Sequence, residues 1–235
     1  MSKKATNKKF IVGITAAFLL PFSLYLVTRA LSKDKIPVPR HFIAEKVDSF
    51  EKDGKMVYDT TFHQTSDQKL INQLGDHVSL NGDLKGKVLV VDFIFVDCQT
   101  ICPQLTGNMK LLQRAFKKND TGVHLVSITV NPEADSFQRL REYADRYSVN
   151  HDRWWFLTGD RKDIYNFARN ELRVTMQPGD GGLDDFIHTE KLVLLDQDRY
   201  ISGYYNGRDS ADVKRCADDV VKVTMEKKKD KKKKE

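Results

Sequence analysis

A nearly continuous run of β-branched and aromatic residues extends from Val88 to Val96. A strand of this composition is apolar on both faces, which is typical of a central parallel strand with helices on either side. The next apolar residues, Leu105, Met109 and Leu112, repeat at helical spacing. Pro103 suits the first turn of that helix, because its missing N–H costs nothing there. The sequence therefore predicts a strand–turn–helix unit at the centre of an α/β fold.

The segments after this unit continue the alternation of strands and helices. A second apolar run at 123–130 is followed by a helical pattern that ends near residue 147. The remaining expected elements are a strand at 154–159, a helix at 161–172, two strands at 191–196 and 200–205, and a final helix at 210–226. An alternation that ends in a strand pair predicts an α/β sandwich, with a mixed central sheet covered by helices.

The N-terminal segment from Phe10 to Thr28 contains no charged residue. Nineteen helical residues span roughly 28 Å, about the thickness of one hydrocarbon core. Lysines precede the segment, no good cleavage site follows it, and basic flanks usually stay in the cytoplasm. The sequence therefore predicts a basic cytoplasmic end at 1–9 and an uncleaved transmembrane helix at 10–31. The rest of the chain is then exported, to the periplasmic side of a bacterial inner membrane.

The rest of the chain divides by composition into three parts. Residues 32–74 begin as a polar linker with two prolines and include weak strand signals that lead into the domain. Residues 75–226 form the α/β domain, and the lysine-rich residues 227–235 form a disordered basic tail. The formal net charge is +6, but much of it lies at the two ends. The basic balance therefore gives no indication of nucleic-acid binding.

Two cysteines, Cys98 and Cys102, stand where the apolar strand passes into the next helix. The N–H groups and dipole of a helix start stabilise a thiolate, and a spacing of four lets two sulfurs meet or share one ion. His188 lies far along the chain and is a candidate third ligand. Two thiolates and one imidazole suit a monovalent copper ion, whereas a structural zinc site normally has four ligands.

Other roles for these thiols remain open from the residues alone. Cys98 and Cys102 could form a disulfide and exchange it with an exported partner, without any metal. They could also be a buried pair without chemistry, although their neighbours are polar. A peroxidase of the same general fold would need an arginine beside the reactive thiol, and none lies near Cys98. The third cysteine, Cys216, lies on the apolar face of a helical pattern and reads as a buried structural thiol.

Four motifs, taken in order, carry a resemblance to a known family. They are the strand–Cys-x-x-x-Cys-Pro–helix unit at 88–103, the strand and turn at 127–136, the Phe-Leu-Thr-Gly strand at 156–159, and the histidine ahead of a strand at 188–195. Together they resemble the SCO/SenC family of copper-delivery proteins. The resemblance implies a thioredoxin-like fold, and copper bound by Cys98, Cys102 and His188. It also implies that the chain delivers copper to the copper centre of cytochrome c oxidase, or reduces the thiols of that centre.

Two positions depart from the pattern of that family. Gln99 follows the first cysteine where the family usually has proline, and Ile187 precedes the histidine where the family usually has aspartate. The first change alters the loop between the thiols. The second removes a hydrogen bond that would orient the imidazole. Both leave the three expected ligands in place.

Overall fold

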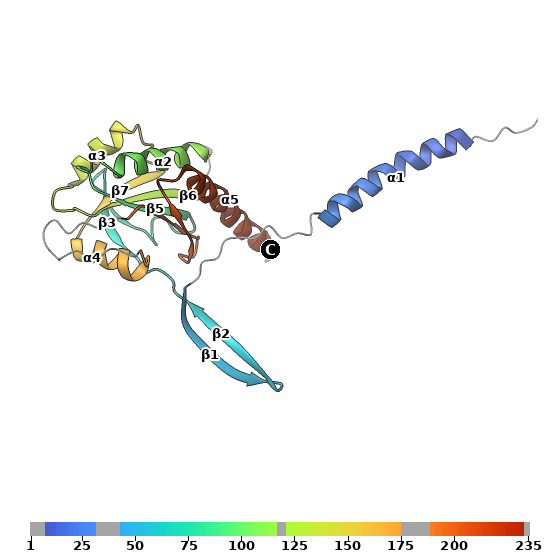
Figure 1. The fold of residues 1–235 in the computed structure, drawn as a ribbon, viewed down its shortest axis with the longest axis horizontal. Coiled ribbons are helices and arrows are strands. Elements are labelled where there is room, and N and C mark those ends of the chain that lie inside the picture. Colours follow the sequence, from blue (N-terminus) through green and yellow to red (C-terminus); the bar gives the residue numbers. More distant parts are fainter. Residues whose placement is uncertain (1–7, 32–42, 117–120, 175–188, 233–235) are drawn as a thin grey trace, which may run out of the picture. The chain divides into compact units, whose positions relative to one another are not determined.

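The computed structural model describes residues 8–31, 43–116, 121–174 and 189–232. It divides into two units, residues 1–37, which contain the helix α1 (Lys8–Leu31), and residues 38–235, which contain all other elements. In chain order the second unit contains β1 (Ala44–Lys52), β2 (Lys55–Phe62), β3 (Lys69–Asn72), β4 (His77–Ser79), β5 (Val88–Ile94), α2 (Cys102–Ala115), β6 (Val123–Thr129), α3 (Phe137–Arg146), β7 (Trp154–Thr158), α4 (Arg161–Asn166), the π-helical turn η1 (Phe167–Glu171), β8 (Lys191–Leu195), β9 (Ile201–Asn206) and α5 (Ser210–Lys232) (Figure 1).

Seven strands form one mixed sheet in the order β4-β3-β7-β6-β5-β8-β9. In the centre of the sheet, β6 runs parallel to both β5 and β7. On its other side, β5 pairs with β8, which runs antiparallel to it. The first parallel pair begins at Val88 opposite Val123. The expected mixed α/β sheet is therefore confirmed, and its central strand is the apolar run that the sequence singles out.

The two faces of β5 belong to two separate hydrophobic cores. Val88, Val90 and Ile94 pack with buried residues of α2, α3 and α5. Leu89, Val91 and Phe93, which alternate with them, pack in a second core that includes α4. Figure 1 shows α2 and α3 on one side of the sheet and α4 on the other. Because both faces are covered, an apolar residue is favoured at nearly every position of this strand.

The N-terminal segment is helical, as the sequence predicts, because α1 covers the expected residues 10–31. Its described side chains, from Ala17 to Thr28, are exposed. Among the residues that the structure describes, however, no helix is both long enough and apolar enough to cross a membrane. The predicted transmembrane crossing is therefore not supported.

The lead-in segment is more regular than the sequence suggests. β1 and β2 form a two-stranded antiparallel hairpin, and the turn residues Asp53 and Gly54 both have positive φ values, of 53° and 72°. This geometry is typical of a type I′ turn, for which Asp-Gly is a preferred pair. The sequence places the start of the α/β domain at residue 75. In the structure the seven-stranded sheet already includes β3, which ends before that residue.

Two helices end differently from the sequence expectation. The helix expected at 161–172 forms α4 and then widens into the π-helical turn η1. α5 continues to Lys232, so it enters the tail at 227–235 that the sequence predicts to be disordered. Lysine and glutamate are good helix formers, and a helix already started by a packed segment extends through them at little cost.

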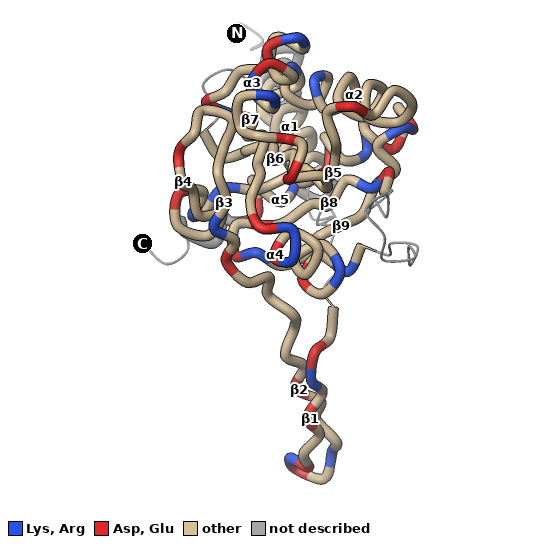
Figure 2. Tube along the Cα trace, turned by 90° about the vertical axis from the view of Figure 1, so that its left-hand side faces the viewer, with Lys and Arg blue, Asp and Glu red and all other residues tan. Residues whose placement is uncertain are grey.

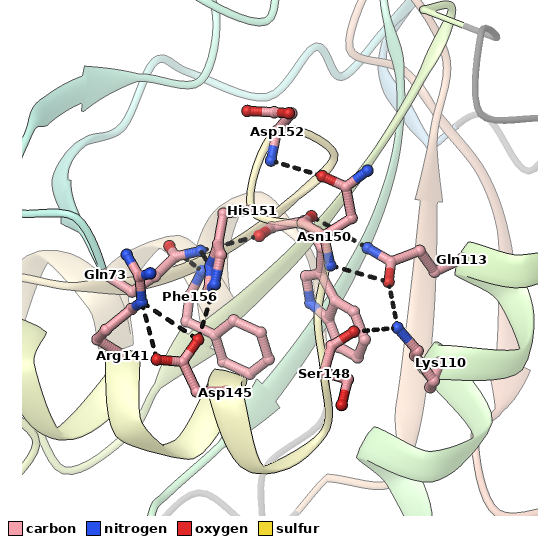
Figure 3. A network of polar contacts seen from close by, with 11 residues as sticks. Gln73, Lys110, Gln113, Arg141, Asp145, Ser148, Asn150, His151, Asp152 and Phe156 are labelled. Carbon is pink, nitrogen blue, oxygen red and sulfur yellow. Dashed lines mark hydrogen bonds and ion pairs between the residues drawn. The ribbon is translucent and has the colours of Figure 1, made fainter.

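Two buried glutamines hold β7 and the loop that precedes it, and Figure 3 shows both side chains. The amide of Gln73 donates to the Trp154 carbonyl at 3.0 Å and accepts from the Phe156 N–H at 2.9 Å. Gln113, on α2, donates to the Asn150 carbonyl at 3.1 Å and accepts from the Asn150 N–H at 3.2 Å. Each side chain thus pairs with one backbone carbonyl and one backbone N–H.

Candidate copper and thiol site

Cys98 lies in the loop after β5, and Cys102 is the first residue of α2. Both side chains are buried and both are free thiols. The N–H of Cys102 donates to the Cys98 sulfur at 3.3 Å. Pro103 occupies the first turn of α2, as the sequence predicts. The predicted pair is therefore brought together at the start of a helix, where backbone donors surround one of the two sulfurs.

The pKa of Cys98 lies below its usual value. Burial alone would raise it, but hydrogen bonds to the thiolate outweigh burial. These come from the Cys102 thiol and from the N–H groups of Cys102, Thr100 and Ile101. Cys98 therefore ionises more readily than an ordinary thiol.

The pKa of Cys102 lies well above its usual value. Burial is the main cause, and the hydrogen bond that the Cys102 thiol donates to Cys98 adds to it. The negative charges of Cys98 and Asp92 raise it further. Of the two sulfurs, Cys98 therefore loses its proton first, an order suited to nucleophilic attack by Cys98 or to a soft metal ion that displaces the Cys102 proton.

A buried carboxylate positions the loop that carries Cys98. Asp135 accepts from the Val96 N–H at 3.1 Å and from the Thr129 hydroxyl at 2.5 Å. Nearby, the guanidinium of Arg139 donates to the exposed carboxylate of Asp97 at 2.7 Å. The loop between β5 and α2 is thus held from the side of β6 and α3.

The described residues that begin at Thr189 are linked to the first turn of α2. The N–H of Gly207 donates to the Glu190 carbonyl at 2.7 Å, and the guanidinium of Arg208 donates to the Glu190 carboxylate at 2.6 Å. Arg208 also donates to the side chain of Gln104 in α2 at 3.1 Å. Glu190 is thus linked through Arg208 to Gln104, which lies two residues after Cys102 in α2.

The predicted site residues differ in how far the structure tests them. Cys98 and Cys102 are brought together, and Cys216 is fully buried in the core as expected. His188 and the glycine-rich segment around it lie outside the described residues. In the part of the chain that is described, no three histidine, cysteine or acidic side chains are close enough to hold a metal ion. Sequence reasoning missed Asp92 and Asp135, although a charged residue inside the apolar run of β5 was a visible sign.

Asp92 is fully buried in β5 and accepts a hydrogen bond of 2.5 Å from the Ser127 hydroxyl. Its second carboxylate oxygen has no hydrogen-bond partner among the described residues. Burial raises the pKa of Asp92 from 3.8 to about 7, and the bond from Ser127 offsets only part of this effect. A carboxyl group that stays protonated to neutral pH therefore lies in the core beneath the thiol site.

Replacing Asp92 by asparagine is expected to remove a pH dependence of stability. Between about pH 4 and pH 7 the folded chain holds a proton on Asp92 that the unfolded chain has lost, so wild-type stability falls as the pH rises through this window. Asp92→Asn should therefore gain up to about 4 kcal/mol relative to wild type between pH 4 and pH 8. Urea unfolding at both pH values measures this difference, and a difference that does not change with pH would contradict it.

The family assignment follows from comparison of the whole domain. The family model described as SCO1/SenC matches residues 58–225, which include every strand of the seven-stranded sheet. The chain belongs to the SCO1/SenC family. The thioredoxin-like fold expected from the sequence is the fold of this family, and the mixed sheet with helices on both faces agrees with it.

Individual relatives of this SCO1/SenC chain support the assignment. The SCO1 protein homolog of Bacillus subtilis is 34% identical over 155 residues, which cover 66% of this chain and 79% of the relative. BsSco, described as a member of the Sco family of cytochrome c oxidase assembly proteins with a disulfide switch, matches with a TM-score of 0.60 and 32% identity, over 69% of this chain and 94% of its own. Arabidopsis thaliana ScoI, solved with copper bound, matches with a TM-score of 0.55 and 27% identity, over 69% and 98% of the two chains.

Proposed function

We propose that this chain is a copper chaperone that binds one Cu(I) ion through Cys98 and Cys102. The observation that carries the proposal is the buried thiol pair, in which backbone and thiol donors stabilise one sulfur as a thiolate. Soft thiolates select Cu(I) over hard cations. The relatives agree with this function, since one binds copper and another is described as a cytochrome c oxidase assembly protein.

His188 is the proposed third ligand. Its support is indirect and comes from Glu190, which the loop at 207–208 attaches to the first turn of α2. In the proposal, the His188 imidazole adds one nitrogen to the two sulfurs and completes a three-coordinate shell. Ile187 replaces the aspartate that the family usually has there, so the ring has lost one acceptor that would orient it.

The proposed mechanism is ligand exchange with an acceptor. When the ion binds, the proton of Cys102 leaves, so affinity should increase as the pH rises. Sulfur or imidazole ligands of the acceptor then replace Cys98, Cys102 and His188 one at a time, so the ion moves without being released to water. The proposed acceptor is the copper-centre subunit of cytochrome c oxidase. The proposed place of action is the periplasmic side of an inner membrane, with the N-terminal segment as the attachment.

Thiol–disulfide exchange is the second candidate function, and the opposed pKa shifts of the two cysteines favour it. The Cys98 thiolate attacks a disulfide of the partner, forms a mixed disulfide and releases one partner thiolate. Cys102 then loses its proton and attacks the Cys98 sulfur, which closes a Cys98–Cys102 disulfide and releases the second partner thiol. Two electrons pass from the pair to the partner, so the copper-centre cysteines are reduced before metal arrives.

Cu(I) titration under anaerobic conditions tests the copper function. The reduced full chain, titrated in competition with a chromophoric Cu(I) chelator, should bind one equivalent. Cys98→Ala and Cys102→Ala should each weaken binding by at least about a thousandfold, because one of two thiolate ligands is lost.

Two further variants complete this titration. Cys216→Ala is the matched control, because it removes a buried thiol that lies outside the site, and it should bind as the wild type does. His188→Ala should weaken binding but leave thiol–disulfide exchange intact. Equal affinity in wild type and in both active-site cysteine variants would contradict the site. Unchanged affinity in His188→Ala would remove the histidine from it and favour the exchange function.

A further inference from the structure

The β1–β2 hairpin forms a sheet of its own, with two free edges. Among the described strands, β1 and β2 pair only with each other, and every residue of β1 is exposed. Phe50, Met56 and Tyr58 are exposed large side chains on this hairpin. A free edge presents unpaired N–H and C=O groups that can accept a further strand. β1 contains no proline that would block such pairing.

The charges of the hairpin are arranged in like-signed cross-strand pairs. Asp48 lies opposite Asp59, and Lys52 lies opposite Lys55. Between them Phe50 lies opposite Val57, so one face carries a negative row, an apolar row and a positive row. Figure 2 shows charged positions of both signs along the two strands. Like charges directly opposite each other destabilise a hairpin. Here the repulsion between Asp48 and Asp59 is offset only in part, by the ion pair of 2.8 Å between Lys46 and Asp48.

We propose that the hairpin is a self-association surface, on which β1 of a second copy of this chain pairs antiparallel with β1 about a two-fold axis at Phe50. In this register Asp48 of each copy lies opposite Lys52 of the other, and the two Phe50 rings meet. Each charged row of the resulting four-stranded sheet then reads Asp59, Asp48, Lys52, Lys55. Every like-signed pair of the hairpin gains an opposite charge beside it.

The backbone geometry selects this register. Lys52 and Lys55 flank the two-residue turn, so they bond to each other, and the outward N–H and C=O groups of β1 belong to alternate residues such as Ser49 and Glu51. Pairing those groups places Asp48 and Lys52 in non-hydrogen-bonded pairs, whose Cα atoms are only about 4.5 Å apart. A shift of two residues in one direction sets Lys46 against Lys52, and in the other direction it sets Glu51 against itself.

The outer edge of β2 offers a similar arrangement about Val57, with Lys55 opposite Asp59. We choose the β1 edge because a cross-strand pair of phenylalanines contributes more than a pair of valines. A single strand pair is a small interface, so the association is weak and depends on protein concentration. High salt should weaken it further, because the charged rows are exposed.

Charge exchange in the full chain tests the proposal by sedimentation equilibrium. Asp48→Lys and Lys52→Asp each turn two attractive pairs between copies into repulsive ones, so each should raise the dimer Kd by about tenfold. The double variant Asp48→Lys/Lys52→Asp restores both attractions and should return to within about threefold of wild type. Within one hairpin each single variant instead removes a like-charge clash, so a purely structural role predicts no loss of association. A wild type that stays monomeric, or single variants that associate as the wild type does, would overturn the proposal.

Disulfide crosslinking tests which edge is used. Phe50→Cys should form a 50–50 disulfide between copies under mild oxidation, which peptide mapping distinguishes from bonds to the native cysteines. Val57→Cys is the matched control on the opposite edge and should stay uncrosslinked. Crosslinking of Val57→Cys in place of Phe50→Cys would overturn the assignment to β1.

Discussion

Cys98 is expected to react with iodoacetamide at least about a hundredfold faster than Cys102 in the reduced chain at neutral pH. Only the thiolate reacts, and the two pKa values are shifted in opposite directions. Hydrogen bonds hold the Cys98 pKa below its usual value, whereas burial and the neighbouring Cys98 raise that of Cys102. Quenched alkylation followed by peptide mapping measures both rates on the same sample.

Cys216 serves as an internal control in this experiment. It is fully buried, and burial raises its pKa, so it should react slowly with no contribution from the active-site loop. As the pH rises, the Cys98 rate should level off earlier than that of an ordinary thiol. Equal rates at Cys98 and Cys102, or a fast Cys102, would contradict the assigned thiolate.

Replacing Arg199 by methionine is expected to lower the free energy of unfolding by at least about 3 kcal/mol. Its guanidinium is buried, at 4% exposure, and ties the turn before β9 to the segment before β5. In that segment its hydrogen bonds are accepted by the side chain of Asn81 and by the carbonyls of Leu80, Leu84 and Lys87. Methionine fills a similar volume but leaves these acceptors unpaired.

Two companion variants make the Arg199 experiment specific. Arg141→Met removes an exposed ion pair with Asp145, so it should cost less than about 1 kcal/mol. Arg199→Lys keeps the charge but cannot reach the same acceptors, so its stability should fall between wild type and Arg199→Met. Urea unfolding measures all three variants. A loss in Arg199→Met no larger than in Arg141→Met would show that the buried hydrogen bonds contribute little.

The parts of the fold that could be predicted are those that depend on apolar patterning. The run at Val88–Val96 predicts β5 because both faces of that strand are buried, and the alternation after it predicts a mixed sheet covered by helices. The hairpin was underestimated because its strands bury no face, so their pattern carries no apolar period. The Asp53-Gly54 turn was the available indication. The continuation of α5 could not be read from charge alone, because lysine is common in tails and in helices alike.

The proximity of Cys98 and Cys102 was predictable from the sequence, but the difference between their pKa values was not. Cysteine spacing and Pro103 identify the pair and the helix start. The unequal pKa values of Cys98 and Cys102 depend on which sulfur the backbone donors face, and the sequence does not encode that orientation locally. Arg199 is similar, because four of its acceptors lie more than a hundred residues earlier in the chain. Such long-range contacts need the fold before they can be seen.

X-ray absorption at the copper edge of the Cu(I)-loaded full chain tests the central claim most directly. The proposed site predicts a first shell of two sulfurs and one imidazole nitrogen, with one sulfur lost in Cys98→Ala and no change in Cys216→Ala. A first shell without sulfur, or a sulfur shell unchanged in the double variant Cys98→Ala/Cys102→Ala, would contradict a copper site built on this thiol pair.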